Sequence, residues 1–221
     1  MVFVGIDEAG RGPVLGPLVI AGVILEEKYL KNLVKVGLTD SKLVPKKKRE
    51  ILLQEILANA TSHHIIMIQP KEIDKNKQNG INLNQTEINA IITILQTLKG
   101  WSKAYVDACD RNTQKMESVI MNQVNGKVIA EHFADLTYPI VSAASIIAKV
   151  TRDREIEKAH KEVGVDFGSG YPNDPKTIKY LHTYYKEHKE LPHIARKSWE
   201  TSKRIIREFE QSNLDNFFKT D

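Results

Sequence analysis

The chain has 221 residues and one cysteine, which excludes an intramolecular disulfide and a zinc site built from several thiolates. Hydrophobic residues make up 41% of the sequence and charged residues 27%, and no apolar run is long enough to suggest a membrane span. We therefore expect a soluble, cytoplasmic protein without a signal sequence. The net charge of +4 favours a polyanionic partner only weakly. Its basic character is concentrated between residues 149 and 207, which hold fourteen Lys or Arg against nine Asp or Glu.

The first predicted strand, residues 2–7, is an apolar run that leads into two adjacent carboxylates, Asp7 and Glu8. Side chains alternate between the faces of a strand, so both carboxylates can serve one site only if the strand bends. Carboxylate oxygens are the ligands that Mg²⁺ and Mn²⁺ prefer. The Gly-Arg-Gly segment 10–12 adds exposed backbone N–H groups and a guanidinium, which suit a phosphate or a sugar hydroxyl. A solvated acidic pair before a surface turn is the alternative interpretation.

Strands and helices then alternate along the chain, which predicts an α/β fold with a central mixed sheet. The second strand is close enough to the first to form a hairpin with it. Strands are expected at residues 18–25, 63–68, 104–107 and 128–133. Helices are expected within 28–40, and at 45–60, 84–98, 113–122, 139–163, 175–188 and 197–210. The polar residues 71–80 are predicted to form a loop.

Two later strands also lead to carboxylates. Asp107 ends one of them, and Asp135 opens the loop before the long predicted helix. Sites in sheets with parallel strands gather at the carboxyl ends of those strands, so both residues are candidates to join the first acidic pair. A turn or helix-capping role is the alternative for each. Asp110 is the neighbour that competes with Asp107, but it does not directly follow the apolar run.

Five stretches of the sequence resemble motifs of one enzyme family. They occur in the family's order, as Gly5 to Pro13 (Gly-Ile-Asp-Glu-Ala-Gly-Arg-Gly-Pro), Thr39-Asp40-Ser41-Lys42, Val106-Asp107, Ser142 to Asp153 after Asp135, and Gly168-Ser169-Gly170-Tyr171-Pro172. On these motifs the chain resembles ribonuclease HII, the type 2 ribonucleases H. Its spacing and single-chain size are more similar to the archaeal branch of that family than to the bacterial one.

The resemblance implies an α/β ribonuclease H-like fold, with a central mixed sheet flanked by helices and a C-terminal helical lobe. We predict a catalytic domain over residues 1–165, the lobe over 166–210 and a tail over 211–221. The implied activity is cleavage of the RNA strand of RNA/DNA hybrids, and nicking of duplex DNA 5′ to an embedded ribonucleotide. The products would be a 3′-hydroxyl and a 5′-phosphate. The implied processes are DNA replication and ribonucleotide excision repair, and we expect a monomer.

The resemblance also assigns roles to individual residues. Two Mg²⁺ or Mn²⁺ ions, roughly 4 Å apart, are expected on four catalytic carboxylates, namely Asp7, Glu8, Asp107 and Asp135. The implied substrate-binding residues are Gly10, Arg11, Gly12, Lys42, Ser145, Lys149 and Tyr171. Among these, the backbone of the Gly-Arg-Gly segment would bind the 2′-hydroxyl, which distinguishes RNA from DNA, and Tyr171 would stack on a sugar. Further contacts to the nucleic-acid backbone are expected from Lys176, Lys179, Lys186, Arg196, Lys197 and Lys203.

The end of the sequence carries a separate signal. Its spacing resembles the sliding-clamp-binding peptide of replication and repair proteins, on residues Gln211, Leu214, Phe217 and Phe218. One helical turn would place the leucine and the two phenylalanines on one apolar face, as binding in a groove requires. The alternative is that the phenylalanines pack on their own domain.

Two other functions remain open on the sequence. One is a different metal-dependent nuclease of the same superfamily, which would lack the combination of the Gly-Arg-Gly segment and Tyr171. The other is a non-catalytic nucleic-acid-binding protein tethered to the clamp. Four carboxylates argue against the second function, because a protein that only binds nucleic acid gains nothing by repelling phosphates.

Overall fold

The computed structural model describes residues 2–35, 38 and 44–217, in two compact units. The first unit comprises Met1–Ala9, Leu18–Met67 and Asn82–Asp153, and the second comprises Gly10–Pro17, Ile68–Ile81 and Arg154–Asp221. Within the described ranges, no helix is both long enough and apolar enough to cross a membrane.

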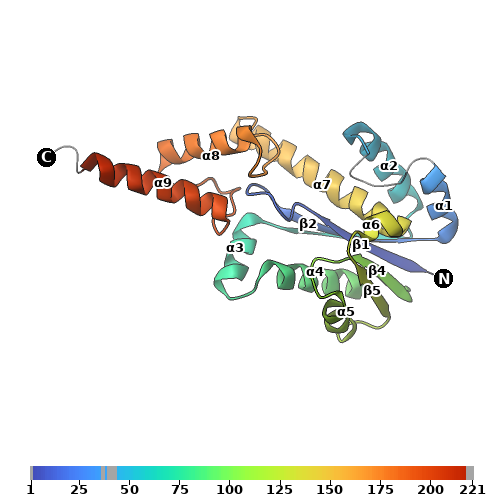
Figure 1. The fold of residues 1–221 in the computed structure, drawn as a ribbon. Helices are drawn as coiled ribbons and strands as arrows, with labels where there is room; N and C mark the ends of the chain where they lie inside the picture. Colours follow the sequence, from blue (N-terminus) through green and yellow to red (C-terminus); the bar gives the residue numbers. More distant parts are fainter. Residues whose placement is uncertain (1, 36–37, 39–43, 218–221) are drawn as a thin grey trace. The chain divides into compact units, whose positions relative to one another are not determined.

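Strands and helices are labelled in Figure 1. The strands are β1 (Phe3–Ala9), β2 (Leu18–Leu25), β3 (Ser62–Ile68), β4 (Lys103–Asp107) and β5 (Lys127–Glu131). The helices are α1 (Glu27–Lys35), α2 (Lys46–Asn59), α3 (Pro70–Gln78), α4 (Leu83–Thr97), α5 (Thr113–Met121), α6 (Ala134–Thr137), α7 (Pro139–Val163), α8 (Pro175–His188) and α9 (Glu200–Phe217).

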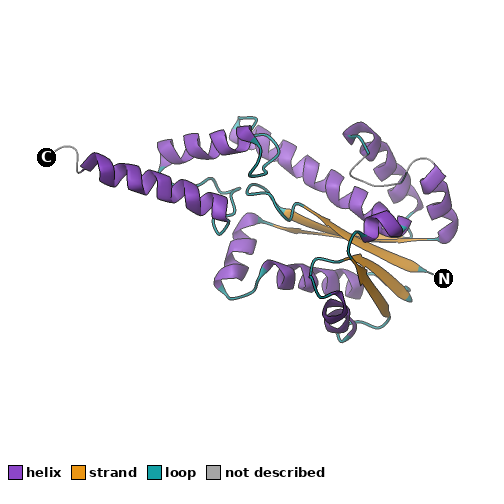
Figure 2. Cartoon of the chain, in the orientation of Figure 1, coloured by secondary structure: helices purple, strands orange, loops and turns teal. Residues whose placement is uncertain are grey.

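The first unit is built on a five-stranded sheet with the order β3-β2-β1-β4-β5 (Figure 2). β1 pairs antiparallel with β2 and parallel with β4, and β4 pairs parallel with β5. The predicted mixed sheet and its opening hairpin are therefore confirmed. Because β1, β4 and β5 run in the same direction, their carboxyl ends lie at one edge of the sheet. The chain segments that follow these three strands therefore start close together.

Helices cover both faces of this sheet, with α7 on one face and α4 and α5 on the other (Figure 1). Every residue of β2 is buried, as expected of a strand covered on both faces. Two glycines allow this close packing. A Cβ atom on Gly5 would lie 2.1 Å from the carbonyl oxygen of Ile140 in α7, and one on Gly22 would lie 2.4 Å from Cγ2 of Ile94 in α4. The glycine in β1 thus determines how closely α7 approaches the middle of the sheet.

The second unit has its own apolar core. Its buried members are Val14, Leu15, Ile156, Ala159, Phe167, Tyr180, Leu181, Leu191, Ile194, Ala195 and Ile205. They come from the segment after β1, the C-terminal part of α7, the loop between α7 and α8, α8, the segment before α9, and α9 itself. An isolated antiparallel β-bridge joins Leu15 to Ala195. The segment after β1 is therefore part of this core rather than a loose surface loop.

Three elements differ from the sequence predictions. The predicted loop 71–80 is mostly the helix α3, and a short helix, α6, carries Asp135 where a loop was expected. The signals for α3 were present, because Pro70 occupies its first turn, Glu72 is acidic near its start and Lys75 and Lys77 lie in its last turn. Only Pro70 and Ile73 of this helix are buried, so its apolar periodicity was too weak to detect. The last predicted helix also continues further, to Phe217.

Candidate active site

Three of the four predicted carboxylates meet at the sheet edge of the first unit. Asp7 and Glu8 lie near the end of β1, and Asp107 ends the neighbouring parallel strand β4. One oxygen from each lies within 4.8 Å of the others. Asp7 is buried, while the other two side chains are partly exposed. The residues that the sequence separates by a hundred positions are thus brought together by strand pairing.

Asp7 is the most buried member of this group, at 5% exposure. Burial raises the pKa of Asp7 well above its ordinary value, and the negative charges of Glu8 and Asp107 raise it further. A hydrogen bond from Ser145 and the charge of Lys149 act on this pKa in the opposite direction, with smaller effect. Without a cation, the protein therefore disfavours full ionisation of the group.

Ser145 and Lys149 form a hydrogen-bonded chain behind Asp7. Nζ of Lys149 donates to Oγ of Ser145 at 3.0 Å, and the Ser145 hydroxyl in turn donates to the Asp7 carboxylate. The two residues are four apart on α7, so they share one face of the helix. Ser145 is fully buried, so its hydroxyl orients the carboxylate from within the protein. Lys149 is partly exposed and supplies a positive charge next to the group.

Asp135 is linked to the group through its neighbour in the chain. The backbone N–H of Ala134 donates to Oδ1 of Asp107 at 2.8 Å, so the start of α6 is tied to the end of β4. Asp135 is 5% exposed, but it is not among the three carboxylates whose oxygens lie within 4.8 Å of one another. The fourth predicted carboxylate therefore lies in the same part of the first unit without belonging to this group. The competing Asp110 has a structural role, because it accepts hydrogen bonds from the Asn84 side chain at 2.9 Å and from the backbone N–H of Asn112 at 2.9 Å.

The donor set fits a hard divalent cation. It consists of carboxylate oxygens alone, which suits Mg²⁺ or Mn²⁺ better than a metal that prefers nitrogen or sulfur. The raised pKa of Asp7 leads to the same conclusion, since a buried anion beside two others requires a positive partner. Any metal that binds must displace the protons that this group otherwise retains.

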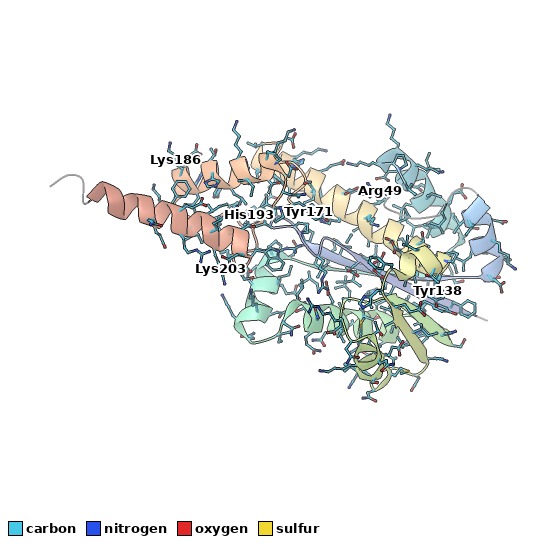
Figure 3. All side chains as sticks on the ribbon, viewed as in Figure 1. Arg49, Tyr138, Tyr171, Lys186, His193 and Lys203 are labelled. Carbon is cyan, nitrogen blue, oxygen red and sulfur yellow. The ribbon has the colours of Figure 1, made fainter. Side chains whose placement is uncertain are left out.

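The predicted substrate-binding residues of the second unit lie on two loops, and backbone hydrogen bonds connect these loops. The N–H groups of Val14 and Leu15 both donate to the carbonyl oxygen of Gly170, at 2.8 and 3.1 Å. Gly12 is exposed, and a Cβ atom there would lie 3.6 Å from the ring of Tyr171. Tyr171 is 39% exposed and is labelled in Figure 3. The Gly-Arg-Gly segment and Tyr171 are therefore neighbours within this unit, as a shared binding role requires.

Arg196 holds the Gly-Arg-Gly segment in place. Its guanidinium donates to the carbonyl oxygens of Gly10 at 2.6 Å, Arg11 at 3.0 Å and Gly16 at 3.0 and 3.1 Å. The side chain is fully buried, so the prediction that it contacts a nucleic-acid backbone is wrong. Gly10 and Gly16 both have positive φ, at 90° and 86°, and their turns leave carbonyl groups pointing inward that need donors. An arginine directly after the apolar pair Ile194 and Ala195 was the available sequence signal, and it is a weak one.

Four predicted residues lie, wholly or in their side chains, outside the described part of the chain. Lys42 and Phe218 are not among the described residues, and the side chains of Leu214 and Phe217 are not described. Gln211 is exposed on α9. The described side chains therefore do not test the predicted sliding-clamp peptide.

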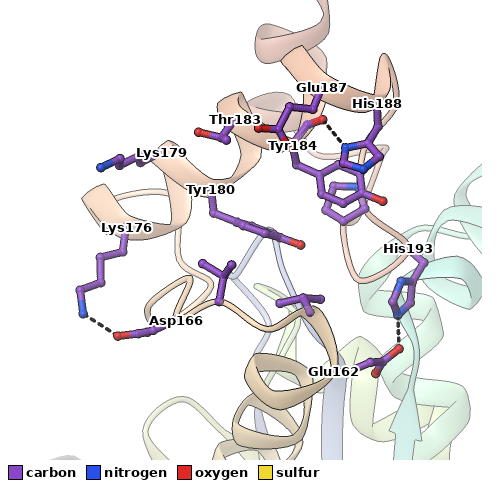
Figure 4. Close-up of a pocket in the computed structure, with 13 residues that line it drawn as sticks. Glu162, Asp166, Lys176, Lys179, Tyr180, Thr183, Tyr184, Glu187, His188 and His193 are labelled. Carbon is purple, nitrogen blue, oxygen red and sulfur yellow. Dashed lines mark hydrogen bonds and ion pairs between the residues drawn. The ribbon is translucent and has the colours of Figure 1, made fainter.

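A cavity of about 740 Å³ lies in the second unit, beside α8 (Figure 4). Charged groups at its rim pair with one another, because Lys176 lies 2.6 Å from Asp166, and His193 lies 3.1 Å from Glu162. None of the predicted catalytic or 2′-hydroxyl-binding residues lines it, although Lys176 and Lys179, which were expected to contact the nucleic-acid backbone, do. The cavity is therefore separate from the predicted catalytic and substrate-binding residues.

We predict that Asp7→Asn raises the melting temperature of the metal-free protein by several degrees at pH 7. The pKa of Asp7 is higher in the folded than in the unfolded chain, so its ionisation opposes folding at neutral pH. The gain should shrink towards zero below about pH 3, where the carboxyl group is mostly protonated in both states. Thermal unfolding in a chelator at both pH values measures this. Added Mg²⁺ should raise the melting temperature of the wild type more than that of the variant. A metal-free variant that is less stable than the wild type at pH 7 would contradict the raised pKa of Asp7.

We predict that Arg196→Lys destabilises the protein by about 3 kcal/mol, which corresponds to a fall of roughly 6–12 °C in melting temperature. An ammonium group cannot reproduce the planar fork that serves three backbone carbonyls, so some of these buried acceptors lose their donors. Lys197→Met is the matched control, since this neighbouring side chain is exposed. Equal stability of Arg196→Lys and the wild type would show that the hydrogen bonds do not hold the segment.

Comparison with known proteins connects this geometry to a family. The profile of the family described as Ribonuclease HII matches residues 4–202. The ribonuclease HII of Pyrococcus furiosus is 44% identical, over 97% of each chain. The crystal structure of the ribonuclease H2 from Pyrococcus horikoshii OT3 is 42% identical, with a TM-score of 0.88 over 95% of this chain and 99% of that one. The ribonuclease HII in a complex with PCNA from Archaeoglobus fulgidus is 36% identical, with a TM-score of 0.83 over 90% of this chain and 96% of that one.

These neighbours confirm the predicted ribonuclease H-like fold, and two of them match nearly the whole of this chain at more than 40% identity. The matched range includes every predicted catalytic carboxylate and Tyr171. The chain therefore belongs to the ribonuclease HII family.

Proposed function

We propose that this chain is an endoribonuclease that cleaves the RNA strand of RNA/DNA hybrids and nicks duplex DNA on the 5′ side of an embedded ribonucleotide. The observation that carries the proposal is the group formed by Asp7, Glu8 and Asp107, with oxygens within 4.8 Å of one another. Such a group repels a phosphate unless cations are bound, so it suits catalysis with metal ions better than binding alone. The expected products are a 3′-hydroxyl and a 5′-phosphate.

The proposed cofactors are two divalent ions, Mg²⁺ or Mn²⁺, held by Asp7, Glu8, Asp107 and Asp135. Ions held there would supply activation of a water for attack on the phosphate and stabilisation of the negative charge on the departing 3′ oxygen. Within the chain, Ser145 fixes the orientation of the Asp7 carboxylate by its hydrogen bond. Lys149 adds a positive charge beside the group and is partly exposed, which supports a contact with the substrate phosphate.

Recognition of the ribonucleotide is proposed for the second unit. The backbone of residues 10–12 would bind the 2′-hydroxyl, and Tyr171 would pack on the adjacent sugar. The short distance between Gly12 and the Tyr171 ring supports this, because both groups can then contact neighbouring parts of one substrate. Contact of Lys42 with a substrate phosphate remains a prediction. So do the monomeric state and the division of roles among residues 1–165, 166–210 and 211–221.

The decisive test is cleavage of a labelled DNA duplex that contains one ribonucleotide. We expect a nick 5′ to the ribose with Mg²⁺ or Mn²⁺, none with chelator, and none in an all-DNA duplex. Asp7→Asn should lower kcat by at least ~10³-fold, because it removes a metal-binding carboxylate. Asp110→Asn is the matched control and should keep wild-type activity, because its carboxylate serves a turn.

Each other outcome identifies a different function. Cutting of both duplexes would indicate a general metal-dependent nuclease of the same superfamily. Binding of hybrids with or without metal, and no cutting, would indicate a nucleic-acid-binding protein instead. Wild-type turnover in Asp7→Asn would show that the carboxylate group is not the catalytic centre.

We also propose that residues Gln211, Leu214, Phe217 and Phe218 bind a sliding clamp. The structural neighbour from Archaeoglobus fulgidus is a complex of ribonuclease HII with PCNA, which supports a clamp as partner for this chain as well. The backbone of α9 is helical up to Phe217, and Gln211 is exposed, so the start of the motif is accessible to a partner. A short helical segment with apolar residues on one face is a form that binds in a groove.

The clamp proposal is tested by surface plasmon resonance with the immobilised archaeal clamp PCNA. Phe217→Ala/Phe218→Ala should weaken binding at least ~10-fold, because two aromatic anchors are removed. Cleavage of a short ribonucleotide-containing duplex without clamp should stay unchanged, which separates this partner from catalysis. Unaltered clamp binding by the double variant would mean that the tail is not the binding peptide.

A further inference from the structure

Phe133 lies between β5 and α6 in a conformation that is unusual for its residue type. Its φ is 58° and its ψ 36°, in the left-handed region that glycine and asparagine tolerate and bulky side chains disfavour. Its side chain is also 62% exposed, although it is large and apolar. Among the described residues other than glycine, only Phe133 and Lys189 have positive φ. Two unfavourable features thus coincide next to Asp135, and strain of this kind is typical of functional sites.

The turn by itself explains the backbone but not the phenyl ring. The left-handed residue turns the chain so that the N–H of Ala134 reaches Asp107 at 2.8 Å, and the carbonyl of Phe133 accepts from the N–H of Leu136 at 3.0 Å. Glycine or asparagine would produce the same turn with less strain. The side chain of Phe133 makes no capping hydrogen bond to α6 either. The turn therefore does not account for the choice of a large apolar side chain at this position.

A second apolar side chain accompanies it. Leu136 is 56% exposed and follows Phe133 by three positions, so the pair flanks the buried residues Ala134 and Asp135 on the short α6 turn. The N–H of Ala134 donates to Asp107, so the two exposed side chains lie on the segment that is tied to the carboxylate group, where a bound nucleic-acid strand would pass. The apolar parts of a duplex surface are its sugars and base edges, which a wide and shallow minor groove exposes.

We propose that Phe133, together with Leu136, is a substrate-positioning residue that packs against the sugars and base edges of the nucleotides flanking the scissile phosphate. The contact would fix the register of the strand over the carboxylates of the first unit. It holds the duplex by apolar contact, whereas the phosphate contacts of the basic residues depend on salt. The inference rests on the nuclease function proposed above.

The test compares Phe133→Asn with Phe133→Trp and with Ile51→Ala. Asparagine keeps the left-handed turn without the ring, and tryptophan keeps an aromatic plane. Ile51 on α2 is 64% exposed, so its truncation is a control for the loss of an exposed apolar side chain. Binding of a ribonucleotide-containing duplex is measured by fluorescence anisotropy in chelator, and KM and kcat are measured with Mg²⁺.

We expect Phe133→Asn to raise Kd and KM at least ~5-fold, the lower range for loss of an aromatic contact to a nucleotide. Its kcat should change less than twofold, its melting temperature should not fall, and its binding should lose affinity at high salt as steeply as the wild type. Phe133→Trp should restore most of the affinity, and Ile51→Ala should match the wild type throughout.

Three results would overturn the inference. One is wild-type Kd and KM in Phe133→Asn. Another is an equal loss in Phe133→Asn and Phe133→Trp, which would show that only the strained turn matters. The third is concentration-dependent dimerisation abolished in Phe133→Asn with nucleic-acid affinity unchanged, which would assign the ring to a contact between copies of the chain. If the wild type cleaves the duplex and Phe133→Asn has the same Kd and KM, the nuclease function stands and only this contact is ruled out. If the wild type cuts no duplex, the nuclease function and this contact are both overturned.

Discussion

The close approach of three carboxylates is the constraint on which the first unit depends. Like charges within 4.8 Å repel, and burial of Asp7 adds to the cost of ionising it. The protein offsets part of this cost with the hydrogen bond from Ser145 and the charge of Lys149, and a bound cation would offset more of it. A group that is unfavourable without metal is well suited to binding metal ions and phosphate together, because each new positive charge relieves an existing repulsion.

The packing of α7 on the sheet makes that arrangement possible. Gly5 lets the start of α7 approach β1 so closely that any larger residue would collide with the carbonyl of Ile140. Ser145 lies further along the same helix, and its position against Asp7 follows from this approach. The orientation of the Asp7 carboxylate is thus set by backbone packing as well as by hydrogen bonds, which ties the stability of the fold to the geometry of the site.

The second unit solves a different problem, which is how to hold a glycine-rich segment in one conformation. Positive φ at Gly10 and Gly16 turns the chain sharply and directs backbone carbonyls inward. Arg196 satisfies them with a buried guanidinium, and the carbonyl of Gly170 ties the following residues to the loop of Tyr171. Recognition through backbone groups requires such support, because a flexible segment would lose conformational entropy each time it bound a substrate.

The sequence by itself determined the strands, most helices and the candidate carboxylates, because apolar periodicity and strand-end acids are local patterns. It also carried the family motifs from Gly5 onward. Strand order and the packing of α7 were decided only by the tertiary structure, which brought Asp107 to Asp7 and left Asp135 outside that close group. The burial of Arg196 and the left-handed turn at Phe133 could not be predicted either. Both depend on hydrogen bonds with residues distant in sequence, for which local patterns give at most a weak signal.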